Sequence, residues 1–543
     1  MRRRTIRILA ILFVSLSALA ALLVFHGFGS RPAHLSDLML DEAEFGSLTD
    51  NRTEDPSLVS ALLCNGFEMP GAGGDFYYSI IEDDPSGMDP LVEVRGNGPL
   101  KLAFLRRALD EGTLRSGDGL RFIAYSDAVY CTGTFYPTTL PVMRITVTEP
   151  DQSGSYDILD RVYRDAEMLL FDNRATIPAT SRYSCSDLTL RVRGNTTAVL
   201  PKQSYRLSLF QVSTGNHRRH NDLPLLGLRA DEDWILYSAG SDSERIRNTL
   251  ANNLWYHSGA AENARGVTLG VECRYVELLM NGQYMGLYSL MYPLDKKQIS
   301  LPDDSYYYRG ASYKQTTPDM LRQATDASVV GGWELRYPSG ASAKGRACWT
   351  GLADYYEHIY KVQGDAYRVW FDKSLDTQNI VNLHLFLSLI DGRDNYYKNN
   401  NVIAYPQDDG SWQYLLAPWD LDLTLGHEFS PDTRWRISDE LSAPDREYNP
   451  WPLPANRMIS LSAEFRHAVL ERWQELRASE WSDEAISALL DEYEQDIFGS
   501  GAMARERERW PDAPNAEDLS QLRSWLRSRL TYLDSYYEEV MGR

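Results

Sequence analysis

The stretch DGRDNYYKNNNVIAYPQDDGSWQYLLAPWDLDLTLG, which begins at Asp391, carries the residue types best suited to chemistry. Asp391 and Asp394 precede a short aromatic segment, and the asparagines 399–401 follow them closely. Asp420 and Asp422 come after that segment, beside a proline and a tryptophan. Acids in loops commonly cap turns and helix ends. The alternative is that their oxygens bind a cation, since Mg²⁺ prefers hard oxygen ligands.

The spacing of these residues favours phosphoryl transfer. Asp394 and Asn399 have four residues between them, as do the base aspartate and the metal-binding asparagine in the catalytic loop of protein kinases. A hairpin is predicted next, from NVIAYP and WQYLLAPW turned at QDDGS. We predict that Asp394 is the catalytic base and that the ligands of Mg²⁺ or Mn²⁺ are Asn399, Asp420 and Asp422. The D-x-x-x-x-N motif alone is a weak signal. Whether it supports a phosphoryl-transfer site depends on the elements that precede it in the chain.

A Gly-Asn turn is predicted between the strands DLTLRVRGNTT and KQSYRLSLF, and it could bring backbone amides and hydroxyls close to phosphates. Lys202 opens the second strand, where a phosphate-pairing lysine would lie, and Arg206 is near. The alternatives are an ordinary hairpin turn and a solvated lysine at a strand end. The predicted nucleotide-binding residues are Arg193, Gly194, Asn195, Thr196, Lys202 and Arg206, with Lys202 also catalytic.

Periodicity and turn signals predict the elements that position these residues. A strand is expected in TTLPVMRITVTE, a helix-like stretch around RDAEMLL, and another strand in DWILYSAG. A helix is expected in DSERIRNTLANNLWYHSG, and a hairpin in RYVELLMNGQYMGLYSLMY, turned at Asn281-Gly282. An apolar helix, residues 376–390, leads into Asp391. Beyond residue 455 the pattern is helical throughout, and these helices are expected to be scaffold.

Charge and composition bear on partners and location. The 543 residues carry a formal net charge of −21 without a long basic run, which argues against nucleic acid as a partner. The N-terminal MRRRTIR precedes an uncharged run, residues 8–25, as in a signal peptide or signal anchor. We predict an uncleaved, single-pass anchor in the cell membrane with the bulk of the chain extracytoplasmic. Secretion after signal cleavage is the alternative. The five cysteines lack zinc-ligand spacing.

Several segments together resemble the CotH-type (spore coat protein H) kinases: LRVRGNTT with PKQSYRLSL, DWILYSAGSDSERIRNTLANNL, VELLMNGQYMGLYSL, DGRDNYYKNNNVIAY and LAPWDLDLTLG. The resemblance covers residues 138 to about 430. It implies a kinase-like fold, ATP with a divalent metal, and phosphorylation of serines in secreted or coat proteins. The residues that match the family's lysine stretch, catalytic segment and W-D-x-D segment are Lys202, Asp394, Asn399, Asp420 and Asp422. Gln203 and Tyr292 depart from the family's pattern, where a basic residue and a glutamate are expected.

The expected fold class is α+β, a protein-kinase-like bilobal fold with a mostly helical C-terminal lobe. A small β-rich domain and an N-terminal transmembrane or signal helix precede it. The expected divisions are 1–29 for the signal segment, 30–55 for a linker, 56–137 for the β-rich domain, 138–300 for the N-lobe and 301–543 for the C-lobe with the C-terminal helices.

The expected function is ATP-dependent phosphorylation of Ser or Thr hydroxyls on secreted or envelope proteins. One alternative is a non-catalytic envelope protein that uses the same fold as a binding scaffold. The other is a different nucleotide-dependent transfer, such as nucleotidylation.

Overall fold

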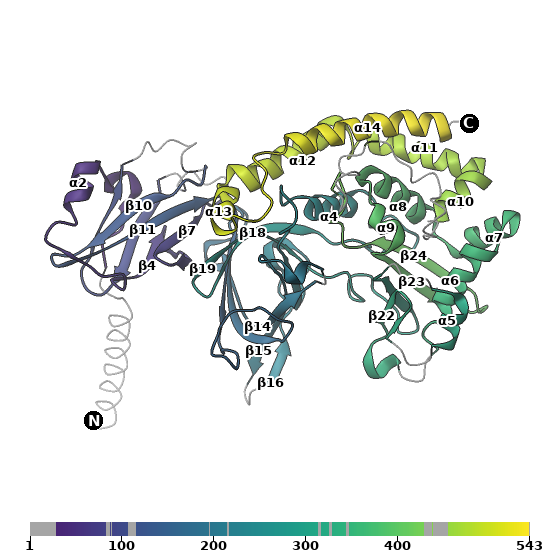
Figure 1. Cartoon of the computed structure of the whole chain (residues 1–543), viewed down its shortest axis with the longest axis horizontal. Coiled ribbons are helices and arrows are strands. Elements are labelled where there is room, and N and C mark those ends of the chain that lie inside the picture. Colours follow the sequence, from purple (N-terminus) through teal and green to yellow (C-terminus); the bar gives the residue numbers. More distant parts are fainter. Residues whose placement is uncertain are drawn as a thin grey trace, which may run out of the picture.

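The computed structural model describes most of the chain from residue 29 onward (Figure 1). The residues described are 29–82, 87, 89–106, 114, 116–194, 196–213, 217–312, 316–324, 328–343, 347–427, 437 and 454–541.

Residues 29–138, the N-terminal module, form two sheets around a separate apolar core. One sheet has the order β1-β8-β4-β5, and the other β2-β9-β10-β11-β7-β6 with β3 added beside β11. One short helix, α2 (Glu42–Ser47), starts with a capping box from Asp41. The strands are β1 (Ala33–His34), β2 (Met39–Leu40), β3 (Thr53–Glu54), β4 (Val59–Cys64), β5 (Phe67–Glu68), β6 (Gly71–Ala72), β7 (Asp75–Ser79), β8 (Leu91–Gly96), β9 (Lys101–Leu105), β10 (Leu120–Tyr125) and β11 (Val129–Thr138).

The next part is a closed ring of seven strands, in the order β14-β13-β12-β18-β19-β17-β15, because β15 also pairs with β14. All neighbours in the ring are antiparallel except β12 and β18. The hairpin strand β16 extends the sheet from β15, and helix α4 follows β17. The elements are β12 (Val142–Val147), β13 (Arg164–Phe171), β14 (Tyr183–Arg193), β15 (Ser204–Ser213), β16 (His217–His220), β17 (Asp233–Tyr237), α4 (Arg247–Ser258), β18 (Cys273–Met280) and β19 (Gln283–Met291).

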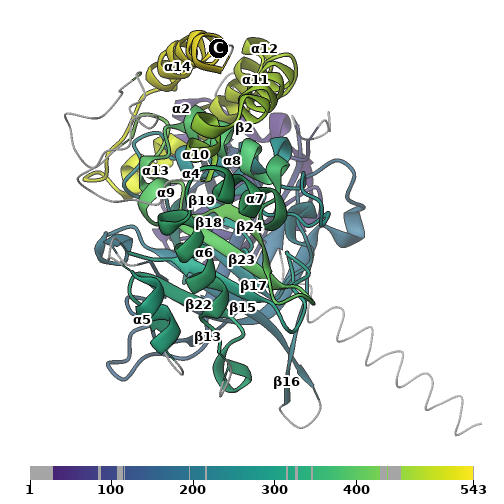
Figure 2. The same ribbon diagram turned by 90° about the vertical axis from the view of Figure 1, so that its right-hand side faces the viewer.

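Beyond the ring, a sheet with the order β21-β22-β20-β23-β24 lies among helices. Figure 2 shows α11, α12 and α14 together above α8, and α11 and α14 both contact α8. The strands are β20 (Tyr306–Gly310), β21 (Val329–Val330), β22 (Trp333–Tyr337), β23 (Asn400–Pro406) and β24 (Trp412–Pro418). The helices are α5 (Pro318–Gln323), α6 (Thr350–Lys361), α7 (Gly364–Ser374), α8 (Thr377–Ile390), α9 (Arg393–Tyr397), α10 (Pro454–Leu461), α11 (Ala463–Arg477), α12 (Asp483–Glu494), α13 (Ala502–Arg509) and α14 (Ser520–Met541).

A single apolar core runs through the ring and the C-terminal part, from Leu140 to Met541. The two parts are therefore packed on each other as one body, and buried side chains fix the position of each relative to the other. Side chains of the ring that lie opposite side chains of the C-terminal part are held in place by this shared core.

The predicted fold class is wrong. In place of a mostly helical C-terminal lobe, residues 301–543 contain the sheet β20–β24, and the part before it is a closed ring of strands. The predicted helix around RDAEMLL is strand β13, in which Ala166, Met168 and Leu170 are buried and alternate with more exposed residues. That alternation has the period of a strand, and it outweighs the helix propensity of the residue types.

The described structure does not bear out the prediction of a single-pass membrane protein. Within the ranges given above, no helix combines the length and the apolarity needed to cross a bilayer. The segment for which the anchor was predicted, residues 8–25, lies outside the described residues.

Candidate functional site

The end of helix α8 and the short helix α9 present Asp394. Asp391 ends α8 in the left-handed conformation, with φ 48°, and the amide of Gly392 donates to the Leu387 carbonyl. The chain then turns into α9, where Asp394 is 7% exposed. Asn399 Nδ2 donates to Asp394 Oδ2 at 2.7 Å, and Lys398 Nζ lies 3.2 Å from the same oxygen. The predicted base and the predicted amide ligand are thus in direct contact.

Backbone hydrogen bonds join this segment to the end of the hairpin. The Asn399 amide donates to the Gly310 carbonyl at 2.8 Å, and the Trp419 amide donates to the Asn399 carbonyl at 2.9 Å. Asn395 Nδ2 donates to the Trp419 carbonyl at 2.7 Å. Asn399 and Asp420 both have positive φ, 55° and 59°. Left-handed residues other than glycine are uncommon and concentrate at functional sites.

Asp420 and Asp422 lie in the loop after β24, and helix α4 holds that loop. Leu421, between them, is buried, and its amide donates to Asn248 Oδ1 at 3.2 Å. Burial, and after it the charges of Asp420 and Asp394, together raise the pKa of Asp422 to about 8. Burial also raises the pKa of Asp394; Lys398 opposes this shift and Asp420 adds to it.

We refer to Asp394, Asp420 and Asp422 as the acidic cluster. Asp420 acts electrostatically on Asp394, and both act on Asp422. Their oxygens are not all within 4.8 Å of one another; among the described residues only Asp222, Asp231 and Glu232 meet that condition. Lys297 Nζ lies 3.5 Å from Asp222 and 3.2 Å from Asp231, so a lysine already serves that second group.

Guanidinium groups on the neighbouring strands interact with one another, and one of them, Arg193, interacts with Asp420 of the acidic cluster. Burial lowers the pKa of Arg193, at the end of β14; Asp420 opposes the shift, and Arg309 and Arg206 add to it. Arg309, on β20, stacks 4.3 Å from the Trp419 ring and donates to Asn401 Oδ1 at 3.2 Å. Burial, Arg309 and Arg206 are among the causes that lower the pKa of Arg336, on β22.

We refer to Arg193, Arg206, Arg309 and Arg336 as the arginine cluster. Arg206 pairs with Asp233 at 2.9 Å. Arg309 and Arg336 were missed in the sequence because they stand in strands β20 and β22, within the region predicted to be mostly helical. Tyr237, at the end of β17, was missed as well. Burial raises its pKa first, followed by the charges of Asp422 and Asp420.

The glycine turn is described in part. Gly194 has φ 96°, and its carbonyl accepts a hydrogen bond from the Arg161 guanidinium. Asn195 lies outside the described residues, and Thr196 begins the 3-10 turn Thr196–Val199. Gln203 Nε2 donates to the Ala198 carbonyl at 2.9 Å, so this departure from the expected basic residue braces the turn.

The Lys202 amine is bound to groups that do not belong to the acidic cluster. It is 1% exposed, and its Nζ donates to the Leu287 carbonyl and to Glu506 Oε1, both at 2.6 Å. Burial lowers its pKa to about 8, and Glu506 opposes that shift. Arg245 Nε also contacts Glu506 Oε1, at 3.0 Å. We call Lys202, Arg245 and Glu506 the lysine network. It brings Lys202 to helix α13, whereas Arg193 lies opposite the acidic cluster.

Tyr292, which departs from the family's pattern, and His384, on helix α8, are both buried in the core. Tyr292 packs edge-on to Trp234, with the Arg229 guanidinium 4.7 Å from its ring, and its hydroxyl accepts from the Glu272 amide. Both ring nitrogens of His384 are without a hydrogen-bond partner among the described residues, and burial lowers its pKa to about 4. Tyr292 therefore fills a structural position where the family's glutamate was expected.

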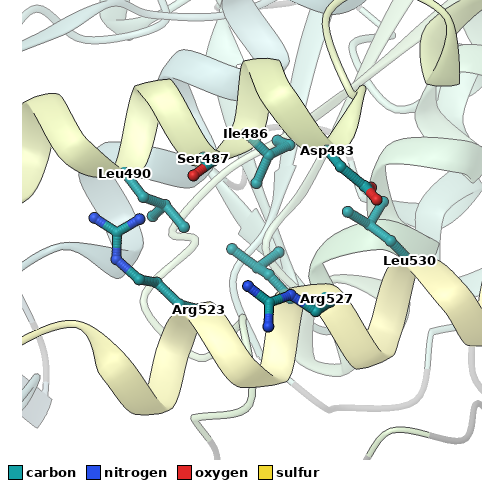
Figure 3. A pocket seen from close by; sticks show the side chains of 8 residues that line it. Asp483, Ile486, Ser487, Leu490, Arg523, Arg527 and Leu530 are labelled. Carbon is teal, nitrogen blue, oxygen red and sulfur yellow. The ribbon is translucent and has the colours of Figure 1, made fainter.

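A cavity between α12 and α14 is a poor alternative site (Figure 3). Its volume is about 60 Å³, with Arg523 and Arg527 at one side and Ile486, Leu490 and Leu530 lining the rest. Sites for drug-sized ligands occupy roughly 300 Å³ or more. This cavity is too small for a nucleotide.

Comparison with protein families identifies the family to which the chain belongs. Residues 190–533 match the family described as CotH kinase protein, which is more than half of the chain. The protein therefore belongs to the CotH kinase family and is a kinase-like protein. A comparison with curated proteins found no match. The family match includes both the acidic and the arginine clusters and excludes the N-terminal module.

Proposed function

We propose that the protein is a metal-dependent phosphotransferase that moves the γ-phosphoryl group of ATP to a Ser or Thr hydroxyl of a protein. The observation that carries the proposal is the interaction of Arg193 with Asp420, which connects a group of arginines to a group of carboxylates. The charge of Asp420 raises the pKa of Asp394 and of Asp422, and Arg193, which other arginines surround, interacts with Asp420. A nucleotide triphosphate with a divalent cation complements both, because its phosphates are anionic and its metal is cationic.

Asp394 is the proposed base. It takes the proton of the acceptor hydroxyl as the acceptor oxygen forms a bond to the γ-phosphorus, the bond between that phosphorus and the bridging oxygen breaks, and ADP leaves. Lys398 and Asn399 both contact its carboxylate and orient it. Asn399, Asp420 and Asp422 are the proposed ligands of Mg²⁺ or Mn²⁺. A metal bound there neutralises charge on the β- and γ-phosphates.

The proposed phosphate-binding groups are Arg193, Arg206, the Gly194 turn and the newly assigned Arg309. Arg193 supports this best, because it is a half-buried cation that other arginines repel. Lys202 is 1% exposed, so it takes part in phosphate binding only if its amine becomes accessible to the nucleotide. The proposal therefore depends on the arginine cluster more than on Lys202.

Labelled ATP tests the proposal. With Mg²⁺ and a dephosphorylated acceptor protein, we expect γ-label but not α-label to be transferred, and an Asp394→Ala variant to transfer about 10²–10⁴-fold less. Asp408→Ala is the matched control, because Asp408 is exposed at the turn of the same hairpin, and it should retain full activity.

Other outcomes would separate the alternatives. Transfer of α-label would indicate nucleotidylation. A thermal shift with ATP and Mg²⁺, but equally little label transferred by the unaltered protein and the Asp394→Ala variant, would indicate a non-catalytic nucleotide-binding protein. No shift and no transfer would refute the nucleotide site.

A further inference from the structure

Helix α13 lies where the N-terminal module meets the ring (Figure 1). Two consecutive residues of this helix, Arg505 and Glu506, are buried, with exposures of 5% and 0%. Their side chains bind different parts of the molecule. Arg505 contacts the N-terminal module and β18, whereas Glu506 belongs to the lysine network. A shift of the helix backbone would therefore disturb both sets of contacts together.

The module-side contacts surround one buried ion pair. Arg505 Nη2 lies 2.6 Å from Glu277 Oε1, and Arg505 Nη1 donates to the Gly117 carbonyl of the module at 2.8 Å. The Tyr284 hydroxyl donates to Glu277 Oε2 at 2.5 Å. The Tyr77 ring, from β7 of the module, stacks on the Tyr284 ring with centroids 5.0 Å apart and planes 4° apart. The module thus helps to bury a charge pair, and loss of either partner would leave the other charge buried and unpaired.

The backbones are also in close contact at this junction. A Cβ added at Gly117 would overlap the Ser500 carbonyl oxygen, just before α13. On the other side of the helix, a Cβ added at Gly286 would overlap the Glu506 carboxylate. Glu506 Oε2 also accepts from the Leu287 amide at 2.9 Å. Helix α13 is therefore held between the module and β19 with no free space at either glycine.

We propose that the N-terminal module positions Lys202 through α13. The module holds Arg505 and the start of the helix, the helix places Glu506, and Glu506 holds the amine of Lys202. The module lies outside the matched family region, 190–533, so this assigns it a role in the kinase-like part and not only a separate one. The inference goes beyond the proposed function and does not require that the protein transfers phosphate.

A glycine pair in the module provides the test. Gly117 and Gly98 both have positive φ, 69° and 100°, so alanine introduces backbone strain at either one. Only Gly117→Ala also collides with α13, since nothing lies within 4 Å of the Cβ position at Gly98. In the full-length chain, the rate at which an amine-acylating reagent modifies Lys202 at pH 8 would be measured by mass spectrometry, together with hydrogen exchange of residues 500–510.

We expect Gly117→Ala to raise both rates at least several-fold and Gly98→Ala to change neither. If exchange in α13 rises while Lys202 stays protected, or if neither rate changes, the proposal is overturned. If Gly117→Ala does not fold, Tyr77→Leu takes its place, with Tyr125→Leu as its control at the module's other small core. Neither readout depends on catalysis, so failure of the proposed function would leave this test intact.

Discussion

Two groups of buried or half-buried charge lie within the region that matches the family, and they differ in how those charges are compensated. In the lysine network, Lys202 and Arg245 both pair with Glu506, and Arg247 nearby pairs with Glu244 at 2.6 Å. In the acidic cluster, Asp420 and Asp422 have no ion-pair partner among the described residues, and Asp420 raises the pKa of both Asp394 and Asp422.

This difference separates structural charge from functional charge. Removing one member of a buried charge pair lowers the stability of the folded protein. Like charges held together cost stability in the folded protein, and such arrangements are common where a ligand compensates them. The lysine that the sequence predicted to be catalytic is in the first group. The arginines, of which the sequence predicted only some, lie nearer the second group. Four changes test this division.

Removing the carboxylate of the lysine network should have the largest effect on stability. Glu506→Ala leaves two buried cations without their shared partner, and we expect the free energy of unfolding to fall by about 3–5 kcal/mol. Urea denaturation followed by circular dichroism would measure it. Glu508→Ala, an exposed glutamate two residues along α13, should change the value by less than about 0.5 kcal/mol. A small loss for Glu506→Ala would show that the network is not structural.

Removing a member of the arginine cluster should weaken nucleotide binding and leave stability nearly unchanged. Hydrogen bonds to charged groups contribute about 1.5–3 kcal/mol. We therefore expect Arg193→Ala to raise the dissociation constant for Mg²⁺–ATP by roughly 10- to 100-fold, measured by isothermal titration calorimetry. Unchanged affinity would remove Arg193 from the phosphate-binding set.

Neutralising Asp422 should flatten the pH dependence of stability in metal-free protein. Its native pKa of about 8 lies above the ordinary value of 3.8, so between these values the folded state holds a proton that the unfolded state has released. Stability should fall as pH rises from about 4 to 8, and Asp422→Asn should reduce the fall by roughly 1 kcal/mol per pH unit. Melting temperatures from pH 5 to pH 8.5, with EDTA present, would show it. Parallel curves for the two proteins would contradict this assignment.

The smallest effect is expected at Asp391, which ends α8 in the left-handed conformation. Asparagine tolerates that conformation well but removes the charge that lies 3.9 Å from the buried Arg529 guanidinium, so Asp391→Asn should lower stability by about 1 kcal/mol and leave phosphate transfer within about twofold. Parallel urea denaturation and transfer assays would check both. A loss of activity comparable with that of Asp394→Ala would place Asp391 in the acidic cluster.

The sequence predicted the elements whose signals are local. The hairpin β23–β24 and helices α4 and α8 form where turn residues and apolar spacing placed them. The convergence of Asp394 with Asp420 followed from their positions on either side of that hairpin. The assignment of metal ligands and base stays a prediction.

The long-range contacts could not be predicted from the sequence. Closure of the ring depends on the pairing of β12 with β18, about 130 residues later, and no local pattern encodes such a pairing. Glu506 stands among many charged residues of the C-terminal helices, which were expected to be scaffold. Only the fold shows that this one is buried against Lys202, 304 residues away.

The most direct test of the central claim, that the acidic and arginine clusters bind a metal nucleotide together, is Mn²⁺ binding in the presence of ATP, followed by electron paramagnetic resonance. We predict that the unaltered protein binds Mn²⁺–ATP more tightly at pH 8.5 than at pH 6.5, because Asp422 must lose its proton to become a ligand. The double variant Asp420→Asn with Asp422→Asn should lose that binding. Equal affinity in both proteins, at either pH, would contradict the account.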